Sequence, residues 1–142
     1  MKKLPPLVVL AWFVFTLAWF LPVITQGGTL ASGVLPGWEA FTAALDIHGD
    51  LHGGDWDAVS SSISRLTALT NFLMLGSMVL LIRRRGQAPA WLSWSFAAAA
   101  IIDLWWTTGG NRSDLLWGYW LWMGSFALMA IAVLIERRKA RA

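Results

Sequence analysis

Long apolar runs alternate with short polar stretches along this chain of 142 residues. The four runs cover about 5–25, 64–82, 90–106 and 115–135. Each is close to the ~20 residues that a helix needs to cross the ~30 Å hydrocarbon layer of a membrane. The pattern therefore predicts an all-α integral membrane protein, in which 1–142 form a single membrane domain built as a four-transmembrane-helix bundle.

The composition agrees with a membrane environment. The chain is 57% hydrophobic and 13% charged, whereas an ordinary soluble domain has about 25% charged residues. Its 11 Trp residues are typical of a protein whose aromatic side chains lie at the two membrane interfaces. The absence of Cys excludes disulfides, thiolate nucleophiles and Cys-based metal sites. No predicted span contains His, so we expect no haem and no other cofactor.

Basic residues gather at alternate ends of the four runs. Of the 11 Lys and Arg, only Arg65 and Arg112 fall on the second side. The positive-inside rule then places both termini and the 83–85 loop in the cytoplasm, as for a multi-pass protein of a bacterial inner membrane. Although the pI is near 10.0, the basic residues do not form a patch interleaved with aromatic residues, so we expect no nucleic-acid partner. The apolar stretch 7–24 exceeds the ~7–15 residues of a signal-peptide core, so we expect a retained anchor.

The first outer loop, 26–63, is long for so small a protein, which indicates structure or function of its own. Within it, Trp38, Phe41 and Leu45 recur at a spacing that places them on one face of a short helix. We expect this helix either to lie in the headgroup region of the membrane or to pack as a cap on the outer end of the bundle.

The stretch "DIHGDLHGGDWD", residues 46–57, brings histidines and carboxylates together. It matches an EF-hand loop in length, but Leu51 stands where that loop requires Gly and Asp57 stands where it requires Glu. The glycines of the stretch disfavour the helix that would bring two histidines to one zinc ion. We therefore predict a solvated loop without a metal, whose candidate ligands would be His48, Asp50, His52 and Asp55. Asp55 and Asp57 are also placed to cap the next helix.

Asp103 is the one charged residue well inside a predicted span. Ser95 and Ala99, at i−8 and i−4, are small, which favours close packing of this face on another helix. Asn71 and Thr67 are at a similar depth on the second span and are expected as hydrogen-bond partners. The carboxyl has two interpretations: a structural one, in which it pairs with Arg65 or Arg112 or reaches the interface, and a functional one, in which it forms part of an ion path. We favour the structural one because no second acid or histidine lies in any span.

The last run carries small residues at positions that permit close helix contact: Gly118, Gly124, Ala127 and Ala130. The motifs "FLPV" and "LPGWEAF" (Leu35 to Phe41), followed by three further spans, resemble small bacterial four-span inner-membrane proteins of unassigned function. The resemblance implies a bacterial inner membrane and carries no catalytic residues.

No glycine-rich phosphate loop, nucleophile elbow or pair of convergent carboxylates is present in the sequence, so we expect no enzyme. We predict an accessory, scaffold or assembly subunit of a larger membrane complex, surrounded by lipid and bound to a membrane-protein partner or to copies of itself. The alternative is a small ion, proton or solute transporter that uses Asp103.

Overall fold

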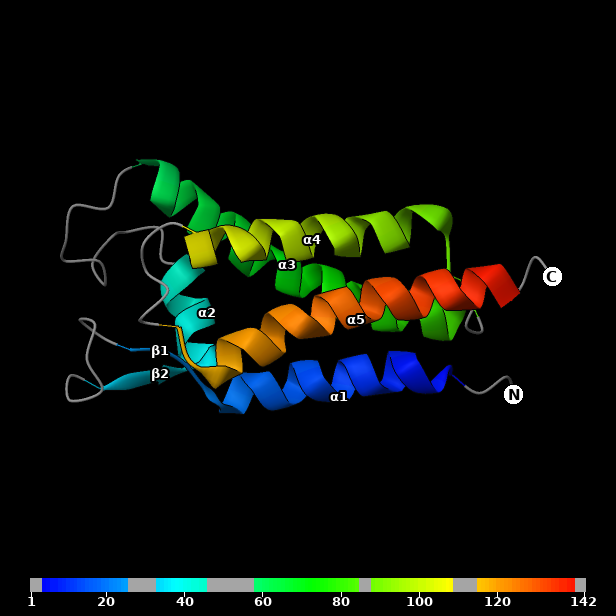
Figure 1. Ribbon diagram of the computed structural model, residues 1–142, viewed down its shortest axis with the longest axis horizontal. Helices are drawn as coiled ribbons and strands as arrows, with labels where there is room; N and C mark the ends of the chain where they lie inside the picture. Colours follow the sequence, from blue (N-terminus) through cyan, green and yellow to red (C-terminus); the bar gives the residue numbers. More distant parts are fainter. Residues whose placement is uncertain (1–3, 26–32, 46–57, 85–87, 109–114, 140–142) are drawn as a thin grey trace.

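The computed structural model describes residues 4–25, 33–45, 58–84, 88–108 and 115–139, and of 58–64, 106 and 108 the backbone alone. It contains five helices and two strands in these ranges (Figure 1). In chain order they are α1 (Pro6–Phe20), β1 (Pro22–Thr25), β2 (Val34–Pro36), α2 (Gly37–Leu45), α3 (Ala58–Arg83), α4 (Ala90–Thr108) and α5 (Trp117–Lys139).

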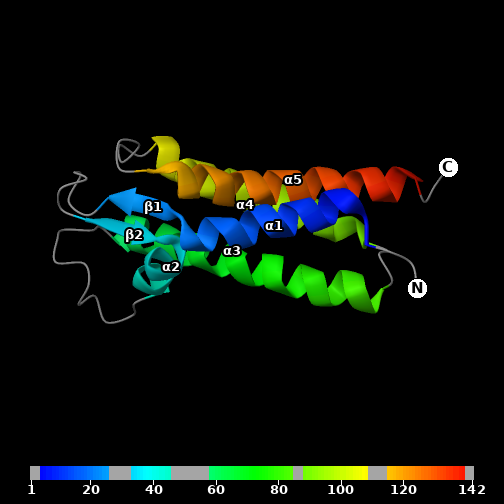
Figure 2. The ribbon, with the colours of Figure 1, turned by 90° about the horizontal axis from the view of Figure 1, so that it is seen from below.

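The four long helices α1, α3, α4 and α5 lie side by side, and successive ones run in opposite directions (Figures 1 and 2). Helix α5 is central, because α1 packs along one of its sides and α4 along another. Helix α3 packs on α4, and the short α2 contacts both α1 and α3. One end of the bundle carries α2 and the two strands and is called the hairpin end below. The other, where α1 and α4 begin and α3 and α5 end, is called the basic end.

Helix α1 begins and ends at prolines. Pro6 occupies its first turn, where the missing N–H of proline would have no partner within the helix. The helix ends at Phe20, and Leu21 is already extended, because Pro22 cannot continue a helix without loss of a hydrogen bond. With 15 residues it is about 22 Å long.

The prediction of an all-α chain is wrong at the end of the first apolar run. Residues Pro22–Thr25 form a strand that pairs antiparallel with Val34–Pro36. On the other edge of β1, Ile24 forms a bridge with Leu115, and the N–H of Leu116 donates to the carbonyl oxygen of Val23 at 2.8 Å. The apolar residues after Pro22 resemble a continuing helix, but they serve as the strand that joins α1 to the start of α5.

The short helix predicted in the first outer loop is present as α2. Phe41 lies 5.3 Å from Trp19 of α1 and 6.0 Å from Phe72 of α3, measured between ring centroids. This face of α2 therefore packs on the bundle, as expected for a cap, whereas Trp38 remains 48% exposed. Leu45, the third residue predicted on this face, is half-buried.

The remaining helices extend beyond the predicted spans. Helix α3 begins at Ala58, six residues before the predicted 64, so the serine-rich stretch ahead of the span is helical and is not a linker. Helices α3 and α5 are long and apolar enough to cross a membrane, over Arg65–Arg83 and Trp117–Lys139. Helix α1 and the Ala90–Trp105 part of α4 are apolar but shorter.

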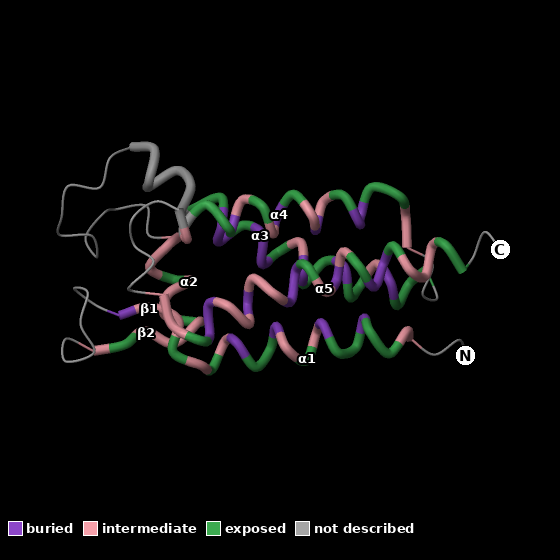
Figure 3. Tube along the Cα trace, viewed as in Figure 1, coloured by how far each residue is buried: buried purple, intermediate pink, exposed green. Residues whose placement is uncertain are grey.

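Each long helix buries a stripe toward its neighbours and leaves large apolar side chains on the outside (Figure 3). On α1 the buried stripe consists of Val8, Ala11, Phe15 and Ala18, a spacing of three and four residues that gives one face of a helix. The outward residues Phe13 and Leu17 are apolar as well. Because both faces of α1 are apolar, burial in this helix is decided by packing and not by polarity.

Helix α2 approaches α1 closely at Gly37. A Cβ atom there would lie 2.6 Å from the carbonyl oxygen of Ala18 and 2.8 Å from Cα of Trp19. The Gly37 N–H also donates to the carbonyl oxygen of Leu21 at 3.1 Å. The absence of a side chain at this position lets the cap dock against the backbone at the end of α1.

We predict that Gly37→Ala lowers the free energy of unfolding by about 1–3 kcal/mol, because backbone atoms must move to admit the methyl group. The measurement is unfolding in detergent micelles followed by circular dichroism. Gly76→Ala on α3 is the matched control, since a Cβ atom there meets nothing within 4 Å and alanine favours a helix by about 1 kcal/mol relative to glycine. Equal stability of the two variants would show that α2 does not dock as described.

Candidate functional site

Polar side chains from three helices meet inside the bundle near the hairpin end. Asp103 belongs to α4, five residues before that helix ends, and Tyr119 lies in the first turn of α5. Because α4 and α5 run in opposite directions, these two residues come to the same level. Together with residues of α3 and one further residue of α5 they form what we call the polar cluster, all of it buried: Thr67, Thr70, Asn71, Asp103, Tyr119 and Trp122.

The helical repeat of α4 carries Asp103 into the interior. Leu92, Phe96, Ala99 and Asp103 follow one another at intervals of four, three and four residues, and all are buried. The predicted close contact at Ala99 is therefore present. Ser95, expected on the same face, is only half-buried and donates its hydroxyl to the carbonyl oxygen of Trp91 at 3.1 Å. Phe96 takes the inward position instead.

The carboxyl group of Asp103 is 0% exposed. Within the described residues, neither carboxyl oxygen has a hydrogen bond of ordinary geometry. Thr70 is the side chain placed to interact with it, but its hydroxyl donates to the carbonyl oxygen of Thr67 at 2.6 Å. The Tyr119 hydroxyl donates to the backbone carbonyl of Asp103 and not to its carboxyl group.

Asn71 reaches the polar cluster, but its bonds go elsewhere than predicted. Its Oδ1 accepts a hydrogen bond from Nε1 of Trp122 at 2.8 Å, and its Nδ2 donates to the carbonyl oxygen of Ala68 at 2.9 Å. The expected hydrogen bond to Asp103 is absent from the described part of the chain. Asn71 instead ties α3 to α5 through a buried side-chain pair.

The ion pair expected between Asp103 and Arg65 is also absent among the described residues. The Arg65 side chain is exposed, whereas the carboxyl group is fully buried, so Asp103 neither pairs with this cation nor reaches the surface. Arg112, the other expected partner, lies outside the described residues. The candidate metal ligands His48, Asp50, His52 and Asp55 lie outside them too.

Aromatic side chains fill the bundle next to the polar cluster on its inner side. Phe126 of α5 lies 5.4 Å from Trp122, 6.0 Å from Phe15 of α1 and 6.1 Å from Phe96 of α4, between ring centroids. Phe126 and Phe96 are 0% exposed. We call these four side chains the aromatic layer. It places aromatic side chains of α1, α4 and α5 between the polar cluster and the basic end, and the buried hydroxyls of Ser77 and Ser125 there donate to backbone carbonyl oxygens of their own helices.

Three members of the polar cluster were not predicted as site residues: Thr70, Tyr119 and Trp122. Thr70 could have been found, because it follows Thr67 by three residues on the face that also carries Asn71. Tyr119 is the only Tyr in the chain and lies at the depth of Asp103, but its partner, a backbone carbonyl, leaves no sequence signal. Trp122 lies inside the predicted span 115–135, but the orientation of its side chain depends on how α5 packs.

Comparison of the chain with protein-family models, with curated proteins and with solved structures finds no match.

We predict that Asn71→Leu lowers the free energy of unfolding by about 1–3 kcal/mol, because the indole N–H of Trp122 is then buried without a partner. The measurement is unfolding in detergent micelles followed by circular dichroism. Ser125→Ala is the matched control: Ser125 is equally buried, but its hydroxyl donates only to the Trp122 carbonyl oxygen within its own helix, so its loss strands no buried donor. The bond between Asn71 and Trp122 would be refuted if both variants lost the same stability.

Proposed function

We propose that this chain is a multi-pass protein of a bacterial inner membrane in which α1, α3, α4 and α5 each cross the bilayer, with the basic end in the cytoplasm. We further propose that it serves as an accessory, scaffold or assembly subunit of a larger membrane complex and is not itself an enzyme. The carrying observation is the distribution of polarity: the bundle is apolar on the outside and holds its polar side chains within.

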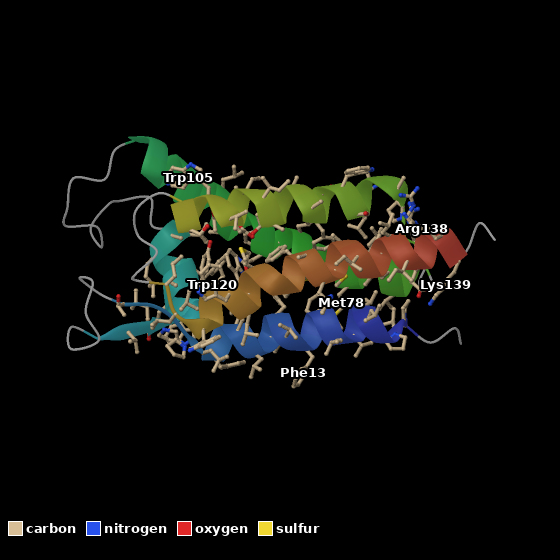
Figure 4. All side chains as sticks on the ribbon, viewed as in Figure 1. Phe13, Met78, Trp105, Trp120, Arg138 and Lys139 are labelled. Atoms are coloured by element: carbon tan, nitrogen blue, oxygen red, sulfur yellow. The ribbon has the colours of Figure 1, made fainter. Side chains whose placement is uncertain are left out.

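The outward apolar surface supports placement in lipid. Phe13 of α1 is 64% exposed, Phe72 of α3 52%, Ile101 of α4 70% and Ile131 of α5 53%, and Phe13 points away from the bundle in Figure 4. Water-soluble monomers rarely expose contiguous apolar patches beyond a few hundred Å². Here every long helix contributes to such a surface, while Asp103 and Asn71 are buried.

The two ends of the bundle differ as the two sides of a membrane require. Arg83, Arg137, Arg138 and Lys139 lie in the last turns of α3 and α5, and Figure 4 shows Arg138 and Lys139 at the basic end, with Trp105 and Trp120 at the opposite end. Cytoplasmic loops of membrane proteins carry an excess of Lys and Arg. Exposed Trp91 and Trp94, near the start of α4, suit the interface beside these charges.

Helix α1 is about 8 Å shorter than the ~30 Å hydrocarbon layer. A short span is accommodated by local thinning of the bilayer and by flanking residues that reach the interface. The hairpin that follows α1 has its backbone paired along both edges of β1. Backbone that is paired in this way can lie at the membrane boundary without unsatisfied polar groups.

The aromatic layer favours an accessory role over a carrier. A transported ion that left the polar cluster along α1, α4 and α5 toward the basic end would meet Trp122, Phe126, Phe96 and Phe15. These side chains offer no carboxyl, amide or hydroxyl group to replace its hydration shell. This packing supports a structural role for the bundle over that of an ion pathway.

An open face on α5 supports association with another helix. A Cβ atom on Gly124 meets nothing within 4 Å, and Ala127 and Ile131 on the same side are exposed. Glycine inside a helix costs about 1 kcal/mol relative to alanine, and small residues in membrane helices let the backbones of two helices approach. Gly118 already serves this purpose within the chain, against the backbone of Leu21 and Pro22. Gly124 is free to do so with a partner.

The test is affinity purification of the tagged full-length chain from membranes in mild detergent. We predict a foreign membrane subunit in fixed stoichiometry, and its loss when Gly124→Leu fills the open face. Gly76→Leu on α3 is the matched control, because it is equally unobstructed but is flanked on its own face by the large side chains of Phe72 and Val79, so the partner should remain bound.

A chain that purifies alone, or only with copies of itself, and that behaves identically with Gly124→Leu would overturn the accessory role. Both variants should remain folded, since neither added side chain meets an atom of the bundle within reach of its Cβ.

A further inference from the structure

We propose that Asp103 is a proton-binding site: in the folded chain its carboxyl group carries a proton, which it donates to Oγ1 of Thr70. The ligand is the proton itself and not a metal ion or an organic molecule. The inference rests on the bilayer placement proposed above and is independent of the accessory role.

The donors around the carboxyl group are already engaged. The Thr70 hydroxyl donates to Thr67, the Tyr119 hydroxyl donates to the backbone of Asp103, and the Trp122 indole N–H donates to Asn71. An ionised carboxylate can only accept hydrogen bonds. Because the Thr70 hydroxyl group has already used its hydrogen, its oxygen can only accept a further hydrogen bond. A carboxylate beside it would bring two acceptors together, whereas a protonated carboxyl group supplies the missing donor.

Burial supports the same protonation state. Both carboxyl oxygens of Asp103 are buried without a hydrogen bond in the described part of the chain, and the residue is 0% exposed. An unpaired charge in such surroundings is so costly that the group neutralises instead. Trp12 and Thr25 also hold a buried polar atom without a partner, but neither side chain can gain or lose a charge in this way.

No described cation is placed to neutralise the carboxyl group. From α5 it is contacted by Tyr119, and from α3 by the uncharged Thr70. On α4 itself, no other residue is charged. Helix α1 has no charged residue, and Glu39 of α2 is itself an acid. Arg65 is exposed, and the cations of α5 lie in its last turn, at the basic end. A proton can neutralise the carboxyl group without the space and the additional ligands that a bound cation requires.

The site is closed to water in the folded chain, because Asp103 is 0% exposed. A proton that leaves Asp103 as H⁺ must be taken up by water, so water must first reach the carboxyl group. The Asp103 carboxylate left behind would be an unpaired charge between α3, α4 and α5. Release of the proton is therefore coupled to opening of that contact.

The test is difference infrared spectroscopy of the full-length chain in phosphatidylcholine nanodiscs at neutral pH, comparing wild type with Asp103→Asn. We predict a carbonyl stretching band of a protonated carboxylic acid that is lost entirely in Asp103→Asn and is unchanged in Glu136→Gln. Glu136 is the matched control because it is a carboxylate at the surface, paired with Lys139 at 2.9 Å.

Thr70→Val should shift the frequency of this band and leave its intensity, because the acceptor of the proton is removed. Thr42→Val is its control: Thr42 makes the same kind of bond, to the carbonyl oxygen of Glu39 at 2.9 Å, but lies on α2. Comparison of Thr70→Val with Thr42→Val keeps the inference testable if Asp103→Asn does not fold.

A wild-type spectrum without the protonated band, or one in which sodium replaces that band with a carboxylate signature, would overturn the proposal. Failure of the chain to enter nanodiscs would instead contradict the bilayer placement, so the two failures are distinguishable.

Discussion

Close packing of polar groups between α3, α4 and α5 is the constraint on which the rest of the fold depends. In a bundle whose exterior is apolar, the usual separation of apolar inside from polar outside does not determine which face of each helix turns inward. The inward face is determined by the few groups that need a hydrogen-bond partner: the Trp122 indole bonded to Asn71 and the Tyr119 hydroxyl bonded to the backbone of Asp103. Polar residues often join helices in this way inside membranes. These bonds set the rotation of α3, α4 and α5 about their axes.

The hairpin end is organised by the backbone. Pro22 ends α1, and β1 then bonds to β2 on one edge and to the segment that enters α5 on the other. Two close approaches depend on glycine: Gly37 against the end of α1 and Gly118 against Leu21 and Pro22. Helix α5 is consequently held to α1 at its first turn, and α2 covers the contact between α1 and α3. The polar cluster lies next to the hairpin end.

Much of the helical framework could be predicted from the sequence, because long apolar runs and prolines are local signals. The positions of the four long helices and the short helix α2 all followed from such signals. The hairpin could not be predicted, since the apolar residues of "PVIT" suit a helix and a strand equally, and the choice was made by pairing with residues distant in the chain. The bridge between Ile24 and Leu115 could not be predicted either, because these residues are also distant in the chain.

For the site, the sequence located its residues but not their partners. Asp103, Asn71 and Thr67 were found from depth and face, and all are buried. The ion pair with Arg65, one of the alternatives given for Asp103, is not formed because α3 presents that cation to the exterior, and the position assigned to Ser95 is taken by Phe96. Rotating a helix by one residue about its axis changes every such pairing, and that rotation is set by the bonds that Trp122 and Tyr119 make between helices.

The most direct test of the bilayer placement uses the absence of cysteine from the chain. Single cysteines are introduced at the exposed apolar positions Phe13, Met78 and Ile131, with Thr42→Cys and Lys139→Cys marking the two ends. Membrane vesicles are then treated with a water-soluble maleimide. The account predicts that the three apolar positions stay unlabelled until detergent is added, and that the two end positions are labelled from opposite sides of the membrane. Labelling of all three apolar positions in intact vesicles, or recovery of the chain in the aqueous fraction, would contradict it.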